Sequence, residues 1–268
     1  MRPNFGILAR TIVRRYGDSI AAVLGIFLFW QLVVWALEIE TYVLPSPIAI
    51  GHEIAARWLL LWKHTLPTMW EVLLGFGLSI FLGIPIATGI VYSKLFAKVA
   101  YKLLVSSQTV PKVALAPIIV IWFGFGIASK VVVAFLIAFF PVVISTVVGM
   151  NSIEPEMLYL ARSLGAGPLQ SFLKFRLPKA LPSIFGGLKV AITLAVVGAV
   201  VGEFIAANKG LGHLIIEAGG VLETELVFAT VIVLSAMGIA LFSFISFAER
   251  ILVKGVRVDI AAQLGATM

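Results

Sequence analysis

The chain has 268 residues, of which 61% are hydrophobic and only 12% are charged, and its mean hydropathy is +1.10. A soluble domain of this length needs far more polar surface, so the composition excludes an ordinary soluble fold. The formal net charge is +7, but the basic residues are bunched between apolar runs, so we expect no nucleic-acid partner. The absence of cysteine excludes disulfides, thiolate metal sites and cysteine nucleophiles.

Six apolar runs occupy most of the chain. About 20 apolar residues in a helix cross the roughly 30 Å hydrocarbon core of a bilayer, and core helices of a soluble protein do not explain five or six such runs. The sequence therefore predicts an all-α polytopic membrane protein with six transmembrane helices, near residues 20–37, 72–92, 106–123, 131–150, 184–206 and 226–248. We expect one transmembrane domain over residues 20–255, between a basic segment (1–19) and a tail (256–268).

Several stretches depart from regular spans. Residues 1–19 mix arginines with apolar side chains, which is typical of an amphipathic helix on an anionic membrane or of a plain basic flank. The prolines of Leu44-Pro45-Ser46-Pro47 break the helix, and residues 48–63 predict a short interfacial helix with two tryptophans at headgroup level. Pro111 and Pro117 interrupt the third span, and residues 207–225 are expected to be a connection.

The distribution of Lys and Arg predicts the orientation. Most of the 20 basic residues lie in four segments, 1–19, 93–103, 151–182 and 249–268. The connections that alternate with these segments along the chain, including residues 128–130, hold few Lys and Arg residues. Because cytoplasmic loops are enriched in Lys and Arg, both termini and the 151–182 segment are predicted to be cytoplasmic.

Residues 151–182 form a connection far longer than a membrane turn needs. Apolar residues recur at helical spacing up to Leu164, Gly165 permits the positive φ of a helix end, and Pro168 suits the first turn of a second helix. The apolar stripe continues to Leu177-Pro178. The pattern predicts two short helices joined at a glycine, which either dock a cytoplasmic partner or rest on lipid.

This segment carries a motif at fixed spacing. Tyr159-Leu160-Ala161 is followed, after three intervening residues, by Gly165, and after nine more intervening residues by Phe175-Arg176-Leu177-Pro178. The spacing resembles the EAA loop of ABC-importer permeases, which reads Glu-Ala-Ala, three residues, Gly, nine residues, then Ile-x-Leu-Pro. The positions that keep the family's residues are Ala161, Gly165, Leu177 and Pro178; those that depart are Tyr159, Leu160 and Phe175. Such departures are common in the nitrate/sulfonate/taurine branch.

Further motifs resemble the same branch in the same order, from residue 42 to about residue 255. They are Leu44-Pro45-Ser46-Pro47, residues 110–117 and 121–124, residues 177–184, and residues 202–206 followed by 210–212. The ordered set identifies the chain as a member of the binding-protein-dependent inner-membrane permeases.

The resemblance implies the MetI-like fold of type I ABC importer permeases and a bacterial inner-membrane location. It also implies a second permease copy, two cytoplasmic ATP-binding subunits, an extracytoplasmic substrate-binding protein and contact with membrane lipid. The chain lacks the Gly-x-x-x-x-Gly-Lys-Ser/Thr phosphate loop, so ATP and Mg are expected on the partner ATPase and no cofactor in this chain. Residues 151–182 would be the ATPase-coupling loop, with these residues at the contact: Tyr159, Ala161, Arg162, Ser163, Gly165, Ala166, Leu177 and Pro178.

Polar side chains inside spans are costly and are candidates for function. Glu203 is expected to shape an outer gate or to form a structural ion pair. Lys112 is expected to face the pathway, to snorkel, or to bond carbonyls freed near Pro111. Glu71 stands where the branch commonly has arginine, which indicates altered pairing, an altered substrate sign or a solvated carboxylate. The predicted pathway and gate residues are Gln108, Thr109, Lys112, Trp122 and Glu203.

The sequence predicts a permease for a small solute, either a nitrate-, sulfonate- or taurine-like anion or a small organic molecule such as a vitamin precursor. The alternative is a self-sufficient secondary transporter or channel, which would predict inverted repeats and paired intramembrane carboxylates. A membrane enzyme would need a catalytic constellation. No aspartate lies between Asp18 and Asp259 and no histidine lies within a span, so neither a catalytic residue nor a metal site is expected.

Overall fold

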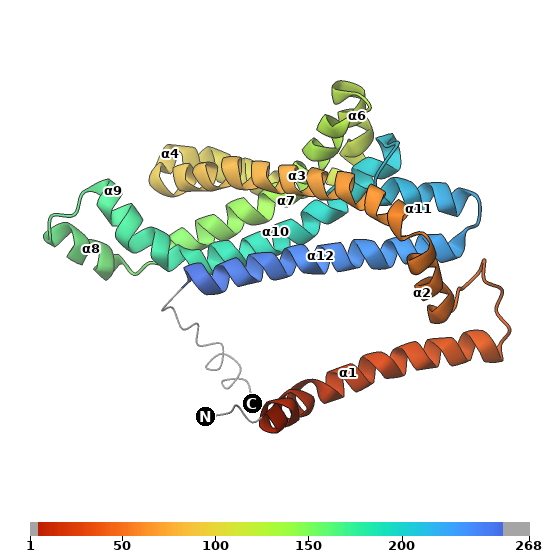
Figure 1. Ribbon diagram of the computed structural model, residues 1–268. Helices are drawn as coiled ribbons and strands as arrows, with labels where there is room; N and C mark the ends of the chain where they lie inside the picture. The colour runs from red at the N-terminus through yellow and green to blue at the C-terminus, as the bar shows by residue number, and fades with distance from the viewer. Residues whose placement is uncertain (1–4, 254–268) are drawn as a thin grey trace. The chain divides into compact units, whose positions relative to one another are not determined.

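The computed structural model describes residues 5–253, apart from the side chains of residues 5–20, Lys94, Tyr101 and Val105. All regular structure in this part of the chain is helical (Figure 1). The elements are α1 (Phe5–Ala36), α2 (Pro47–Ala56), α3 (Trp58–Tyr92), α4 (Lys94–Phe96), the π-helix η1 (Ala97–Tyr101), α5 (Lys102–Ser107), the 3-10 helix η2 (Lys112–Leu115), α6 (Ala116–Phe123), α7 (Ile127–Asn151), α8 (Pro155–Ser163), α9 (Pro168–Ser171), the π-helix η3 (Phe172–Arg176), α10 (Leu177–Ala206), α11 (Leu211–Gly220) and α12 (Thr224–Leu252). The predicted tail, residues 256–268, lies outside the described residues.

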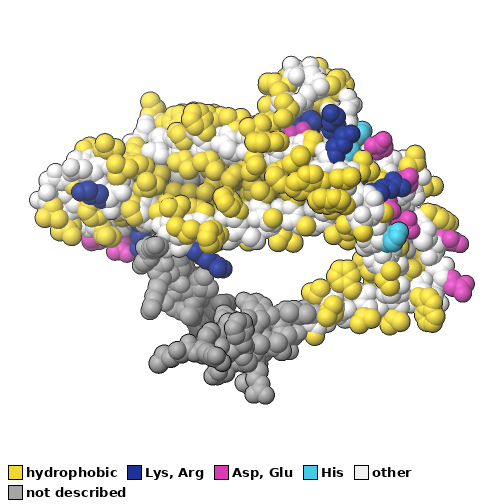
Figure 2. All heavy atoms as spheres, in the orientation of Figure 1, with side chains coloured by type: hydrophobic (Ala, Val, Ile, Leu, Met, Phe, Trp, Pro, Cys, Tyr) yellow, Lys and Arg dark blue, Asp and Glu magenta, His cyan; other side chains and the backbone are white. Residues whose placement is uncertain are grey.

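Among the described residues, four helical segments are long and apolar enough to cross a membrane: Trp58–Tyr92, Ile127–Asn151, Pro168–Ala206 and Thr224–Leu252. Two shorter apolar helices, Ala21–Ala36 and Lys112–Phe123, lie where the first and third spans were predicted. Figure 2 shows hydrophobic side chains over much of the visible face of the long helices. The all-α class is confirmed, whereas six crossings and the positions of the termini stay predictions.

Three predicted boundaries are wrong. The short interfacial helix ends at Ala56, and residues 58–63 instead begin the long helix α3. The connection over residues 207–225 contains the helix α11. The second helix of the 151–182 segment does not stop at Leu177-Pro178 but runs without a break into α10. Proline breaks the regular hydrogen-bond ladder of an α-helix, but Pro178 comes two residues after the π-helix η3, where that ladder is already interrupted.

The chain divides into two compact units. One comprises the described part of residues 1–62 with Leu214–Val233, and the other comprises Lys63–His213 with the described part of residues 234–268. In the second unit α7 packs along α10 more extensively than any other helix pair. Small residues allow this approach, as is typical of helices that pack within membranes. A Cβ atom on Gly198 of α10 would lie 2.6 Å from Cα of Ala134 of α7.

The Gly198→Ala substitution should therefore force the two helix backbones apart. We expect it to destabilise the protein by about 1–3 kcal/mol, as overpacking of a core does. Gly186→Ala is the matched control, because Gly186 lies in the same helix and has open space around the position of a Cβ. Thermal unfolding of both purified variants in detergent measures the difference. Equal midpoints for the two variants would contradict the close packing of α7 on α10.

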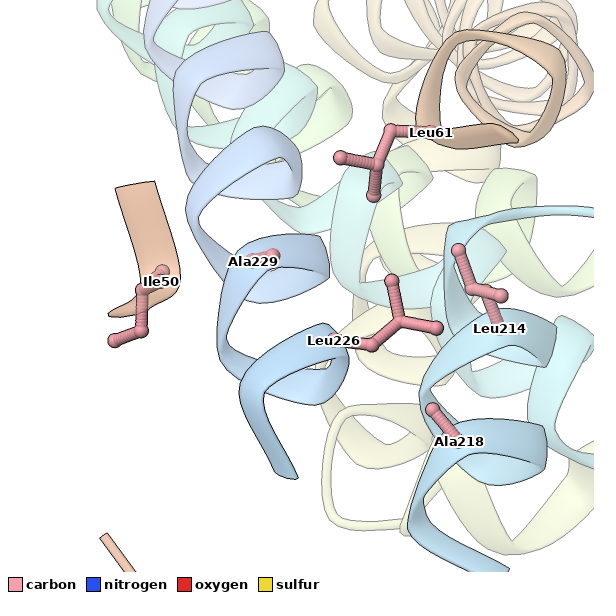
Figure 3. Close-up of a cluster of buried hydrophobic side chains, with 6 residues drawn as sticks. All are labelled: Ile50, Leu61, Leu214, Ala218, Leu226 and Ala229. Atoms are coloured by element: carbon pink, nitrogen blue, oxygen red, sulfur yellow. The ribbon is translucent and has the colours of Figure 1, made fainter. Parts of the chain in front are cut away.

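The first unit has a core of its own. The helix α2 begins after Ser46, whose hydroxyl accepts a hydrogen bond from the amide of Ala49 at 3.2 Å. Arg57 closes the same region through ion pairs to Glu53 at 2.7 Å and to Glu223 at 2.6 Å. Figure 3 shows the buried apolar side chains of this core, from α2, α3, α11 and α12: Ile50, Leu61, Leu214, Ala218, Leu226 and Ala229.

Candidate functional site

The helix α8 and the turn after it form the first half of the predicted coupling loop. The amide of Gly165 donates to the carbonyl of Arg162 at 2.9 Å, and the amide of Ala166 donates to the carbonyl of Ala161 at 3.0 Å. These two hydrogen bonds make a complete Schellman motif, which requires a left-handed residue after the helix. Gly165 has φ +75°. The structure thus confirms the predicted helix end at Gly165.

The second half of the loop starts at once. Pro168 occupies the first turn of α9, and the side-chain oxygen of Gln170 accepts a hydrogen bond from the amide of Gly167 at 3.4 Å. The chain then continues through η3 into α10. Figure 1 shows α8 and α9 beyond the ends of α7 and α10, joined by a bend. The loop is therefore one rigid extension of α10 that carries α8 at its tip.

The tip of this loop exposes apolar side chains. Leu164 is 74% exposed, Tyr159 66% and Leu160 57%, whereas Ala161 is fully buried. Arg162 and Ser163 are exposed as well, and Ala166 is half-buried. Further along, Leu177 is half-buried and Pro178 is exposed. An exposed apolar patch on a projecting loop marks a surface that another molecule covers.

The loop is also tied to the end of α3. The guanidinium of Arg176 lies over the ring of Tyr92 at 5.0 Å, and Tyr92 meets Phe172 edge-to-face at 6.1 Å. No described residue gives Nη1 of Arg176 a hydrogen-bond partner, so the cation–π contact is the main interaction of that end of the side chain. A displacement of the loop would thus reach α3 as well as α7 and α10.

Gly165→Ala tests the turn at the tip. A φ of +75° strains any residue with a Cβ by about 1–2 kcal/mol, and we expect ATP-driven uptake to fall several-fold because α8 is re-aimed. Gly167→Ala is the control, since Gly167 has φ −67° and open space around it. Gly165→Asn should be milder than Gly165→Ala, because asparagine tolerates this region. The same uptake for Gly165→Ala and Gly167→Ala would contradict a role for this turn.

A buried charged cluster lies in the same unit, in the helices α3, α7 and α10. We define it as Glu71, Lys130 and Glu203 with the hydroxyl of Thr68. Lys130 and Glu71 form an ion pair, and both residues are buried. The carboxyl group of Glu71 also lies beside that of Glu203. Oε2 of Glu71 has no hydrogen-bond donor among the described residues.

Glu203 holds the turn that follows α10. Its Oε1 accepts a hydrogen bond from the Thr68 hydroxyl at 2.6 Å, and its Oε2 accepts one from the amide of Gly212 at 2.5 Å. The Thr68 hydroxyl in turn accepts from the amide of Leu211 at 2.8 Å. A Cβ on Gly210, which has φ +124°, would collide with the Glu203 carboxylate. The carboxylate and the Thr68 hydroxyl therefore each satisfy one of the first two amides of α11, and together they fix the turn against α3.

Two predictions about these charges are wrong. Lys130 was assigned to a short outer connection, but it lies inside α7 and is buried against Glu71. A solvated Glu71 is likewise excluded, since its exposure is 1%. The ion pair with Lys130 agrees with altered pairing at this departure from the branch's arginine, and an altered substrate sign stays a prediction.

The sequence comparison decides the family. A family model described as the binding-protein-dependent transport system inner membrane component matches residues 75–258. The chain belongs to this family. It is the permease of an ABC importer, a membrane-spanning transport subunit and not a catalytic one, and the alternative of a self-sufficient transporter or channel is set aside.

Several relatives of this permease are themselves named as transport permeases. The riboflavin transport system permease RibX of Chloroflexus aurantiacus is 37% identical over 231 residues, 85% of this chain and 86% of that protein. The formylaminopyrimidine transport permease ThiX of Halalkalibacterium halodurans is 38% identical over 232 residues, 85% and 93% of the two chains. The putative aliphatic sulfonates transport permease SsuC of Bacillus subtilis is 32% identical over 245 residues, 90% and 89% of the two chains. The predicted branch is thereby confirmed.

A solved structure supports the fold. This permease superposes on a chain of the inward-facing MetNI methionine ABC transporter with a TM-score of 0.62, over 75% of this chain and 99% of that chain. The sequence identity is 19%. The likeness confirms the predicted MetI-like fold.

The predicted pathway residues of this permease do not form one cluster. Gln108 and Thr109 are exposed in the turn between α5 and η2, and Trp122 is 76% exposed on α6. The ammonium of Lys112 lies 4.2 Å from the centre of the Phe140 ring. Glu203 is buried, and its carboxylate oxygens accept hydrogen bonds from Thr68 and Gly212, neither of which belongs to the predicted set. Their role in a pathway stays a prediction.

Sequence reasoning missed Thr68 and Lys130 as partners of the carboxylates. The available signal was charge balance, because a buried lysine must find a counter-charge, and Glu71 and Glu203 lie in two other apolar helices. The partners themselves were not predictable, since Thr68 and Glu203 are 135 residues apart in the chain.

Proposed function

We propose that this permease forms the membrane pathway of an ATP-driven importer for a small solute, as one of two identical permease chains in a bacterial inner membrane. Two cytoplasmic ATPase subunits dock on the 151–182 loop, and an extracytoplasmic binding protein delivers the solute. Both termini and the loop face the cytoplasm in this arrangement, as the distribution of Lys and Arg predicts.

The observation that carries the proposal is the exposed apolar tip of the loop. Leu160 and Leu164 lie on α8 and at its end, on a rigid extension of α10, and nothing in the described chain covers them. A partner that encloses this tip and changes shape on binding ATP would move α10 directly. Transport is then a switch between two states, which the nucleotide and the docked binding protein bias.

Two solute classes are supported to different degrees. The relatives named for riboflavin and formylaminopyrimidine transport are 37% and 38% identical, whereas the relative named for aliphatic sulfonates is 32% identical. We therefore favour a heterocyclic vitamin or vitamin precursor over a sulfonate- or taurine-like anion.

The test is reconstitution. The permease is co-expressed with the ATPase encoded beside it, purified, and placed in liposomes with the neighbouring binding protein. We expect co-purification of the ATPase, and ATP hydrolysis that rises when the binding protein carries a solute. Uptake by the permease alone, without ATPase or ATP, would refute the proposal. A ligand screen on the binding protein, with riboflavin, formylaminopyrimidine and taurine as probes, decides the solute class.

A further inference from the structure

A cavity of about 890 Å³ lies at the ends of α3 and α7, against η1 and the start of α5. Its floor is apolar, since Ile90 and Val147 are buried there. Its rim is polar and exposed, and consists of Lys98, Lys102 and the residues at the end of α7. All of these residues belong to one compact unit. The cavity is separate from the buried charged cluster and from the exposed tip of the coupling loop.

The two lysines carry uncompensated charge. Neither Lys98 nor Lys102 makes an ion pair with a carboxylate in the described part of the chain. The carbonyl end of α7 at Asn151 favours nearby cations, which accounts for some basic charge here. It does not account for an apolar hollow below that charge. Two ammonium groups above an apolar floor complement an anion that carries a hydrocarbon part.

The segment that carries the lysines also exposes apolar side chains beside them. Leu95 is 77% exposed, Val99 54% and Leu103 65%. Their spacing of four residues places them on one side of a helix, and Lys98 and Lys102 repeat at the same spacing beside them. An exposed apolar stripe of this kind is expected where a membrane protein meets acyl chains. The cavity is therefore within reach of a lipid at the membrane surface.

We propose that this cavity binds an anionic phospholipid, whose phosphate is held by Lys98 and Lys102 and whose first acyl segment lies on Ile90 and Val147. Basic pockets between membrane helices are known to take such headgroups. A volume of this size suits one lipid headgroup with the start of its chains. The inference rests on the membrane location of the permease and not on its coupling to an ATPase. An experiment can therefore disprove the lipid site without disproving the coupling to an ATPase, and the reverse.

The experiment measures lipid preference directly. The full-length permease is delipidated in neutral detergent and titrated with phosphatidylglycerol or phosphatidylcholine, and bound lipid is counted by native mass spectrometry. We expect the wild type to bind phosphatidylglycerol about tenfold or more tightly than phosphatidylcholine, since each lysine near an anionic headgroup contributes substantially. Lys98→Gln with Lys102→Gln should abolish most of this preference.

Lys174→Gln with Lys179→Gln is the matched control, because it removes two exposed lysines that do not line the cavity. This control should keep the wild-type preference. Equal loss in both double variants would overturn the proposal in favour of a general effect of net charge. An unchanged preference in the Lys98→Gln, Lys102→Gln variant would overturn it as well.

The hydrocarbon part is tested by filling the cavity. Val148 is 58% exposed and lines the cavity, so Val148→Trp should displace phosphatidylglycerol, whereas Val190→Trp, at a 53% exposed position on α10, should not. Displacement of the lipid by inorganic phosphate at equal concentration would mean a small-anion site and overturn the proposal. The chain has no cysteine, so Val148→Cys adds a single thiol. Quantitative disulfide formation between two copies would show that a second permease covers the cavity, and would also overturn it.

Discussion

Glu203→Ala is expected to destabilise the permease by about 2–4 kcal/mol, because two buried donors lose their acceptor. The Thr68 hydroxyl and the Gly212 amide both donate to this carboxylate, and Glu203 is only 2% exposed. The turn before α11 would lose its attachment to α10 through the Gly212 amide, and only Thr68 and His64 would still hold it to α3. Thermal unfolding of the purified variant in detergent measures the loss.

Glu249→Ala is the matched control for this variant. Glu249 accepts a hydrogen bond from Lys189 at 2.8 Å within an ion pair that is about a quarter exposed on each side. Partly solvated pairs contribute roughly 0–1 kcal/mol, so this control should change the midpoint little. Equal destabilisation by the two alanine variants would contradict the account of the buried cluster.

Glu203→Gln separates the two roles that the sequence left open for this residue. A glutamine keeps one acceptor oxygen of similar geometry but adds an NH2 group that faces a donor. If Glu203 is structural, Glu203→Gln destabilises the permease less than Glu203→Ala does and leaves the apparent KM for uptake unchanged. If it lines a gate for the solute, the apparent KM changes while the unfolding midpoint does not. The hydrogen bonds of Glu203 favour the first result.

The sequence predicts those parts of the fold that depend on local signals. The Schellman turn at Gly165 follows from a glycine after an amphipathic helix, and the broken third span follows from Pro111 and Pro117. The start of α2 at Pro47 lies one residue before the helix that was predicted from residue 48 on. Each of these features is decided within a few residues, which is why the sequence is sufficient.

Errors arise where tertiary packing outweighs a local signal. Lys130 carries a charge of the kind that marks a loop, yet the helix α7 continues through it because Glu71 supplies a buried counter-charge. The helix α11 begins at Leu211, and its first amides are satisfied by Glu203 and Thr68 from other helices and not by a local cap. Neither partner is visible from the neighbouring sequence, so a connection was predicted there.

The prediction for the coupling loop is a loss of the ATPase without a loss of the fold. Leu160→Asp combined with Leu164→Asp places two charges on the exposed tip, and we expect ATPase co-purification and ATP-driven uptake to fall more than tenfold. Burying an unpaired carboxylate in an interface costs several kcal/mol, and about 1.4 kcal/mol is tenfold in affinity. The unfolding midpoint should stay near the wild-type value, since Leu160 and Leu164 are 57% and 74% exposed.

Val221→Asp with Leu222→Asp adds the same charge at an equally exposed place, the turn between α11 and α12, which is predicted to lie on the opposite side of the membrane. Leu222 has φ +60°, which aspartate adopts more readily than leucine. This control should retain the ATPase. If the loop only rests on lipid, the Leu160, Leu164 variant would also retain it, and the permease would have to be driven through another surface. Loss of the ATPase from the tip variant alone, at unchanged stability, is the result that distinguishes a docking surface from a lipid-resting loop.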